Sequence, residues 1–256
     1  MNPELASPSR SEFCRILGIP FFLGDAEQAV ARMRAGGLLA VPAAPALNQL
    51  TRNSGYREAL LNADLVIPDS GFMVLVWNLV SRPSIPRLSG FKYLQVLLGQ
   101  PDVREPRNAF WIMASASSAT RNRQWLASQG IEVPAENIYI APFYGEVMED
   151  QELLAQISRT RPLHIIVTLG GGTQERLGLY LKRSLDYSPA IHCIGAAIAF
   201  LSGDQVRMPQ WADKLYVGWA FRCLSKPRQY VPRYWSARTL ARLMVRYGSE
   251  LPPLGG

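Results

Sequence analysis

The sequence predicts an α/β protein in which a parallel sheet is flanked by helices. Over the first 200 residues, short apolar runs alternate with longer stretches of helical periodicity, as in successive βαβ units. The run His-Ile-Ile-Val-Thr-Leu at 164–169 is typical of a central strand buried on both faces. A chain of 256 residues with 48% hydrophobic and 18% charged residues is long and apolar enough to form a sizeable core.

The expected elements follow one another in this alternating order. We expect strands at 38–41, 63–67, 109–113, 137–140, 163–169 and 190–194. We expect helices at 25–35, 45–62, 71–81, 117–129, 147–160 and 173–185. Beyond Gly203 the strand pattern stops, prolines recur and helical patterns dominate. We therefore divide the chain into an α/β domain at 1–203 and a helical, basic appendage at 204–256.

The C-terminal region carries most of the net charge. Residues 201–256 contain nine Lys/Arg and three Asp/Glu, a net charge of +6 out of +7 for the whole chain. Trp and Tyr side chains are interleaved with these basic residues, a combination typical of surfaces that contact an anionic membrane or a nucleic acid. A solvated basic helix face is the alternative.

Within that region, residues 236–247 show the periodicity of one amphipathic helix. Arg238, Arg242 and Arg246 recur every four residues and lie on one side. An apolar stripe beside them consists of Leu240, Leu243, Met244 and Tyr247. The stripe fits either packing against the α/β domain or contact with lipid.

The composition also bears on where the protein works. No apolar run approaches the roughly 20 residues that a membrane-spanning helix needs. The first residues lack the basic-then-apolar pattern of a signal peptide, and Cys14, Cys193 and Cys223 have no disulfide or zinc-site spacing. We therefore expect the protein in the cytoplasm.

Three loops follow predicted strands at the edge where ligands bind in open parallel sheets. The first, Pro68-Asp69-Ser70-Gly71, places an acid and small residues before a helix, which suits either a phosphate site or a simple helix cap. The second begins with Gly170, Gly171 and Gly172 and continues to Gln174 and Glu175; its backbone N–H groups could approach a phosphate. The third begins at Gly195.

Several chemistries lack their usual residues. The only histidines, His164 and His192, lie within predicted buried strands, and no Gly-x-Ser-x-Gly motif is present. No Asp-x-Asp pair is present, and the acidic cluster 149–152 fits the first turn of a helix. Glu175 stands where a dinucleotide fingerprint would have its third glycine. We therefore expect no metal site and no cofactor, so a diphosphate leaving group would need cationic side chains or helix N-termini.

An ordered set of motifs resembles the WecG/TagA/CpsF family, glycosyltransferase family 26. Ala63-Asp64-Leu65-Val66-Ile67-Pro68-Asp69 resembles the family's Ala-Asp-(apolar)-Pro-Asp-Gly segment, and Arg87-Leu88-Ser89-Gly90 its Arg-Val-x-Gly. Gly170 with Gln174-Glu175 is similar to its Gly-x-Pro-Lys/Arg-Gln-Glu loop, and 194–203 to its Gly-Val-Gly-Ala-Ala-Phe-Asp-Phe-Leu-Ala-Gly. Residues such as Arg207, Trp211 and Trp219 continue the family order, so the resemblance covers nearly the whole chain, from about 13 to 235.

This resemblance implies a Rossmann-like fold and an inverting, metal-independent transfer of a sugar. The donor would be a UDP-sugar and the acceptor a polyprenyl-diphosphate-linked saccharide, in the synthesis of exopolysaccharide, teichoic-acid linkages or common antigen. The enzyme would be peripheral, on the cytoplasmic face of a bacterial plasma membrane with an anionic surface, and no nucleic acid would be involved. Nothing in the sequence indicates the oligomeric state.

The resemblance also assigns roles to residues. Asp69 would be the general base, and Arg87 would lie near the donor diphosphate. The candidate substrate-binding residues are Ser70, Gly170, Gly171, Gly172, Gln174, Glu175 and Gly195. The residues expected to bind the lipid diphosphate are Arg207, Arg222, Arg228 and Arg233.

The chain departs from the family pattern after its first predicted strand. Val41-Pro42-Ala43 stands where many relatives have Thr-Pro-Asn, so two polar groups are missing. We expect a changed donor or acceptor. The alternatives are a catalytically impaired homologue that acts as a membrane-docked scaffold, and a nucleotide-binding oxidoreductase or regulator.

Overall fold

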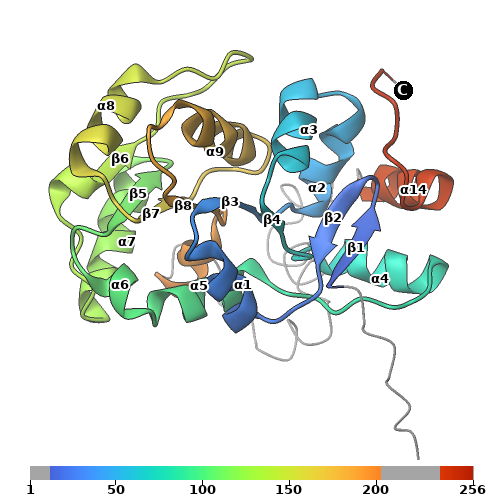
Figure 1. The fold of residues 1–256 in the computed structure, drawn as a ribbon, viewed down its shortest axis with the longest axis horizontal. Coiled ribbons are helices and arrows are strands. Elements are labelled where there is room, and N and C mark those ends of the chain that lie inside the picture. Colours follow the sequence, from blue (N-terminus) through green and yellow to red (C-terminus); the bar gives the residue numbers. More distant parts are fainter. Residues whose placement is uncertain (1–11, 203–236, 256) are drawn as a thin grey trace, which may run out of the picture.

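The computed structural model describes residues 12–202 and 237–255. They form an eight-stranded sheet with helices on both faces, in the strand order β1-β2-β4-β3-β8-β7-β5-β6 (Figure 1). All neighbouring strands are parallel except β1 and β2, which form an antiparallel hairpin. The predicted α/β class, with a mostly parallel, Rossmann-like sheet, is confirmed.

The strands lie close to their predicted positions, with an additional hairpin at the start. Their bounds are β1 Phe13–Ile16, β2 Ile19–Phe22, β3 Gly37–Ala40, β4 Leu65–Val66, β5 Ala109–Met113, β6 Ile138–Ile140, β7 His164–Val167 and β8 Ala190–Cys193. Sequence reasoning missed the hairpin because its turn, Leu17-Gly18, lacks the usual Asn-Gly or Asp-Gly signal. Leu17 nevertheless adopts a φ of 51° there.

The helices also follow the predicted alternation. Their bounds are α1 Ala26–Met33, α2 Ala44–Leu47, α3 Ser54–Leu61, α4 Gly71–Val80, α5 Gly90–Leu98, α6 Pro101–Arg104, α7 Ala116–Ser128, α8 Gln151–Thr160, α9 Thr173–Ser184, α10 Ala197–Leu201 and α14 Ala237–Tyr247. The predicted helix 45–62 is interrupted, because a 3-10 turn at Asn48–Thr51 ends before Asn53, whose side chain caps α3. Sequence reasoning missed α5, α6 and α10.

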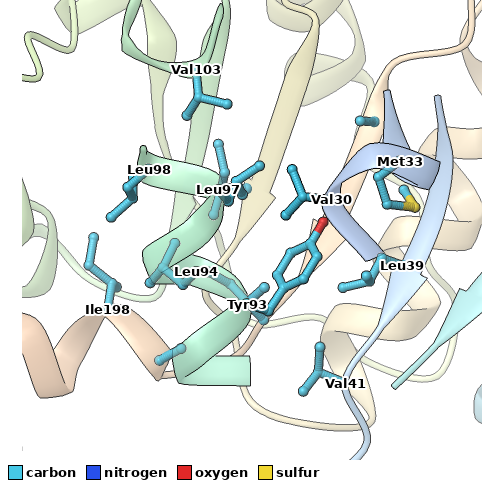
Figure 2. Packing of buried hydrophobic residues seen from close by; sticks show 14 of the residues in the cluster. Val30, Met33, Leu39, Val41, Tyr93, Leu94, Leu97, Leu98, Val103 and Ile198 are labelled. Atoms are coloured by element: carbon cyan, nitrogen blue, oxygen red, sulfur yellow. The ribbon is translucent and has the colours of Figure 1, made fainter. Parts of the chain in front are cut away.

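Each face of the sheet has its own apolar core. On one face, α1, α5, α7 and α10 cover side chains such as Leu39, Trp111 and Ile166. Figure 2 shows Tyr93 of α5 beside Val30 and Leu39 in this cluster. On the other face, α3, α8 and α9 cover the alternate side chains of the same strands. The open carboxyl edge between these layers is where the predicted site lies.

The C-terminal helix α14 is part of this packing. Leu240 and Met244, of its predicted apolar stripe, are 0% and 1% exposed in a cluster with side chains of β1, β2, α2 and α4. Of the two possibilities for this stripe, the structure therefore shows packing against the α/β body. The chain around the predicted boundary at 203/204 lies outside the described residues, so that division stays a prediction.

The helices of the described chain are all too short or too polar to cross a bilayer.

Candidate active site

The predicted site loops emerge at the same carboxyl edge of the sheet. Asp69 follows β4, Gly195 follows β8 and Gly170 follows β7. The first residue of α5, Gly90, lies where these loops meet: a Cβ added to it would be 2.9 Å from Val41 Cγ1 and 3.9 Å from the Ile194 carbonyl oxygen. The absence of a side chain at Gly90 therefore lets α5 approach the ends of β3 and β8.

Asp69 and Arg87, both predicted to be catalytic, lie together at this edge. The Arg87 Nε donates a hydrogen bond of 2.6 Å to the Asp69 backbone carbonyl, and an Arg87 Nη lies 3.7 Å from Asp69 Oδ1. The side chains of Arg87 and Asp69 are 16% and 29% exposed, so both remain accessible from solvent. The pair thus offers a fixed positive charge next to a partly exposed carboxylate.

Among the described residues, contacts to the Asp69 carboxylate are made through one oxygen. The backbone N–H of Gly90 donates to Oδ1 at 3.0 Å. Within the described residues, Oδ2 accepts no hydrogen bond, which leaves it able to take up a proton from a substrate. Sequence reasoning missed the part that Gly90 plays, although the position lies in the quoted Arg-Leu-Ser-Gly motif.

Asp69 is not the cap of its own helix. The N-cap of α4 is Ser70, whose hydroxyl accepts from the Met73 N–H at 3.2 Å and is 8% exposed. The simple explanation of Asp69 as the cap of the helix that follows it therefore fails. Ser70, expected to bind substrate, uses its hydroxyl oxygen to cap α4.

Gln174 and Glu175 bind the two glycine loops to each other. Gly172, with a φ of 95°, donates its N–H to Glu175 Oε2 at 2.7 Å, and Gly195 donates to Gln174 Oε1 at 2.6 Å. The Gln174 amide in turn donates to Glu175 Oε1 at 3.1 Å. These three bonds fix the relative positions of the loops after β7 and β8.

The same two side chains are buried rather than open to a ligand. Gln174 is 2% and Glu175 0% exposed, and burial raises the pKa of Glu175 to about 7 despite its hydrogen bonds. The exposed part of the loop is Gly170 and Gly171. Among the described residues their N–H groups have no backbone acceptor, so they are the groups best placed to receive a phosphate.

The two histidines lie in the core, as expected from their strands. His192 Nδ1 is 2.8 Å from the Tyr93 hydroxyl, and its Nε2 is 3.1 Å from His164 Nδ1. His164 Nε2 lies 3.4 Å from Asp102. Burial lowers the pKa of both rings, so they form a neutral polar chain inside the protein.

A comparison with known protein families identifies the family of this chain. A model described as "Glycosyl transferase WecG/TagA/CpsF family" matches residues 14–251. The chain belongs to this family. The match extends from the β1–β2 hairpin through α14, so it includes every loop described above.

Two curated relatives are glycosyltransferases with the same name. Each is an N-acetylglucosaminyldiphosphoundecaprenol N-acetyl-beta-D-mannosaminyltransferase. The one from Bacillus spizizenii is 26% identical over 208 residues, which cover 78% of this chain and 78% of the relative. The one from Bacillus subtilis is 24% identical over 189 residues, which cover 72% of this chain and 71% of the relative.

The family's Thr-Pro-Asn position has an apolar character here. Val41 is 6% exposed and belongs to the core cluster that includes Leu39 and Tyr93. Ala43 is exposed at the N-cap of α2, where it supplies no side-chain hydrogen bond. Neither residue therefore presents a polar side chain after β3, and Val41 lies directly against Gly90.

Two further predictions concern the ligands of the lipid diphosphate and of a metal ion. The residues predicted to hold the lipid diphosphate, Arg207, Arg222, Arg228 and Arg233, lie outside the described residues. The described part of the chain has no group of three or more His, Cys, Asp or Glu placed to hold a metal ion. The acidic cluster 149–152 serves as expected at a helix start, since Asp150 caps α8 and accepts from the Tyr139 and Tyr144 hydroxyls.

Proposed function

We propose that this glycosyltransferase moves a sugar from a UDP-sugar to a polyprenyl-diphosphate-linked saccharide, with inversion at the anomeric carbon. The observation that carries the proposal is the partly exposed Asp69 carboxylate beside Arg87, fixed through Oδ1 and without a hydrogen-bond donor at Oδ2 among the described residues. The acceptor class is supported by the relatives, whose names specify an undecaprenol diphosphate acceptor. The donor nucleotide comes from the resemblance of the motifs to the family.

The proposed chemistry is one displacement. The acceptor hydroxyl attacks the anomeric carbon, the bond to UDP breaks, and Asp69 Oδ2 takes up the hydroxyl proton. Attack from the face opposite the leaving group inverts the configuration. A single positioned base is enough because the diphosphate leaves without being protonated.

Arg87 is proposed to stabilise the negative charge that develops on UDP. The Arg87 Nε bond to the Asp69 carbonyl orients the planar guanidinium beside the candidate base, and a guanidinium is suited to planar phosphate contacts. The exposed N–H groups of Gly170 and Gly171 would add partial positive charge at the start of α9. With these donors the transfer would proceed without a metal ion.

The pathway would be the synthesis of a bacterial cell-surface polysaccharide on the cytoplasmic face of the plasma membrane. The basic, aromatic sequence of 204–256 supports contact with an anionic membrane, and Arg207, Arg222, Arg228 and Arg233 remain the proposed ligands of the lipid diphosphate. A panel of UDP-sugars, scanned by thermal shift and followed by mass spectrometry of products on polyprenyl-diphosphate acceptors, tests this function. A new glycosidic bond on the acceptor is the expected result. UDP binding without product would instead favour the scaffold suggested by the loss of polar groups at Val41 and Ala43.

A further inference from the structure

Helix α4 is apolar on its outer side as well as on its inner side. Its sequence, Gly-Phe-Met-Val-Leu-Val-Trp-Asn-Leu-Val, contains no charged residue. The inner side buries Met73, Val74 and Trp77. The outer side carries Leu75, Leu79 and Val80, which are 43%, 86% and 45% exposed. A surface helix of a water-soluble protein normally has charged residues on that side, so this face is suited to a second apolar environment.

The one Asn side chain of α4 does not make the outer side of the helix polar. Asn78 donates to the Ile85 carbonyl at 3.0 Å and accepts from the Ile85 N–H at 2.8 Å. Its amide therefore holds the loop after the helix in place instead of contributing polarity to the outer side.

Helix α14 packs against α4 and adds positive charge at the same end of the molecule (Figure 1). Arg242 and Arg246 are exposed, and no carboxylate of the described residues pairs with either. Val245, between them, is 68% exposed. We call the exposed side chains Leu75, Leu79, Val80, Arg242, Val245 and Arg246 the α4–α14 face.

We propose that the α4–α14 face docks on an anionic lipid bilayer and holds α4 in the plane of its headgroups. Apolar side chains beside exposed arginines match the acyl boundary and the anionic headgroups of such a surface. A second copy of the chain matches less well, because neither helix has an acidic residue to pair with the other copy's arginines. The proposal rests on the proposed function for its purpose, since a lipid-linked acceptor is presented at that surface.

Docking in this way would bring the site to the acceptor. Asp69 and Ser70 immediately precede α4, and a helix of ten residues is about 15 Å long. Every residue of the docked helix therefore lies within about 15 Å of the candidate base, so docking would hold the base close to the headgroups from which a lipid-linked acceptor projects.

Vesicle binding by the full chain tests the docking surface. We would compare vesicles of phosphatidylcholine alone with vesicles of phosphatidylcholine and phosphatidylglycerol in equal parts. Leu79→Glu should lower the affinity at least about tenfold on the mixed vesicles, because an inserted leucine is replaced by a charge. Arg242→Gln with Arg246→Gln should lower it about fivefold per arginine on the mixed vesicles and leave binding to neutral vesicles unchanged.

Leu163→Glu is the matched control, because Leu163 is 52% exposed and immediately precedes β7, outside the α4–α14 face. Its vesicle affinity should equal that of the wild type. Equal affinity of Leu79→Glu and wild type would overturn the proposal. The proposal would also be overturned if sedimentation velocity showed a wild-type dimer that Leu79→Glu dissociates while the vesicle affinity stays the same.

Transfer assays separate this proposal from the proposed function. With an acceptor embedded in mixed vesicles and a short-chain, water-soluble acceptor, Leu79→Glu should lower the ratio of the first rate to the second. An unchanged ratio would contradict docking through this face. If the wild type transferred sugar to neither acceptor, the proposed function would fail, and vesicle affinity would still decide the docking surface.

Discussion

At the scale of single residues, the site separates groups that can face a substrate from groups that hold those in place. Asp69 and Arg87 are partly exposed, and so are Gly170 and Gly171. Glu175, in contrast, is fully buried, and its carboxylate accepts hydrogen bonds from the Gly172 N–H and the Gln174 amide. Because substitutions in the two groups should have different consequences, kinetics and stability can tell them apart.

Replacing Arg87 tests the exposed group. Arg87→Ala should lower kcat/KM by about 10²–10³, since it removes the charge proposed to stabilise the leaving group and also the bond to the Asp69 carbonyl. UDP binding, measured by calorimetry, should weaken as well. Arg82→Ala, an exposed arginine in the preceding loop, is the control and should match the wild type. EDTA should leave the wild-type rate unchanged; a strict requirement for magnesium or manganese would contradict the proposed role of Arg87.

Replacing Glu175 tests the buried group through the pH dependence of stability. The folded protein holds a proton on Glu175 up to about pH 7, whereas the unfolded chain releases it near 4.5. The resulting stability is therefore fully present below pH 4.5 and is lost as pH rises through 7. That change corresponds to roughly 3 kcal/mol at about 1.36 kcal/mol per pKa unit.

The measurement is the free energy of unfolding in urea for the wild type and Glu175→Gln, from pH 4.5 to 8. The wild type minus variant difference should fall by up to about 3 kcal/mol as pH rises. Contributions of His164 and His192, whose lowered pKa values act in the opposite direction, cancel in this difference. Glu58→Gln controls for the loss of one exposed carboxylate. A difference independent of pH would show that Glu175 is already ionised in the folded protein.

At the scale of elements, the sequence predicts best the strands that consist of continuous apolar runs. Residues 109–113 form β5 as expected, because five buried side chains in succession leave little choice. The β1–β2 hairpin escaped prediction because Leu17 takes an unusual backbone conformation that its residue type does not signal. For α5, the Ser89 cap is a helix signal that apolar runs alone do not reveal.

The site was predictable to a similar, limited extent. Parallel strands must end at one edge, so the loops holding Asp69, Gly170 and Gly195 could be placed together from sequence. The direction of individual side chains could not. Gln174 and Glu175 follow a glycine loop and suggested ligand contacts, yet both turn inward to satisfy backbone N–H groups.

The packing of α9 on the sheet gives a prediction at this scale. A Cβ at Gly178 would lie 2.5 Å from Leu38 Cδ1 and 2.7 Å from Cys193 Sγ, both in the core. Gly178→Ala should therefore destabilise the protein by about 1–3 kcal/mol in urea unfolding. At Gly55 of α3 the nearest atom would be 3.4 Å away, so Gly55→Ala should be neutral or slightly stabilising. Equal effects would mean that α9 can shift without cost.

At the scale of the whole molecule, the two ends of the described chain stabilise each other. The N–H groups of Leu17 and Gly18 donate to the carbonyls of Gly248 and Ser249, and α14 packs over β2 and α4. Since α4 begins at the candidate base, α14 also supports the position of the site. Residues from 237 onward therefore contribute to the stability of the α/β body.

A pair of truncations on α14 tests this coupling. Leu240 is fully buried, so Leu240→Ala should cost about 2–5 kcal/mol of the free energy of unfolding. Val245 is 68% exposed on the same helix, so Val245→Ala should change it by less than about 0.5 kcal/mol. A small cost at Leu240, measured by urea unfolding of the full chain, would show that α14 folds independently of the α/β body.

Asp69 is proposed to be the base of a transfer to a lipid-linked acceptor. The most direct test of this role is product formation from a UDP-sugar on N-acetylglucosaminyldiphosphoundecaprenol by wild type, Asp69→Asn and the exposed control Asp186→Asn. Asn can still accept the Gly90 N–H, so fold and UDP binding should persist while the rate falls by about 10²–10⁴. Asp186→Asn should match the wild type. Full turnover by Asp69→Asn would show that Asp69 is not the base.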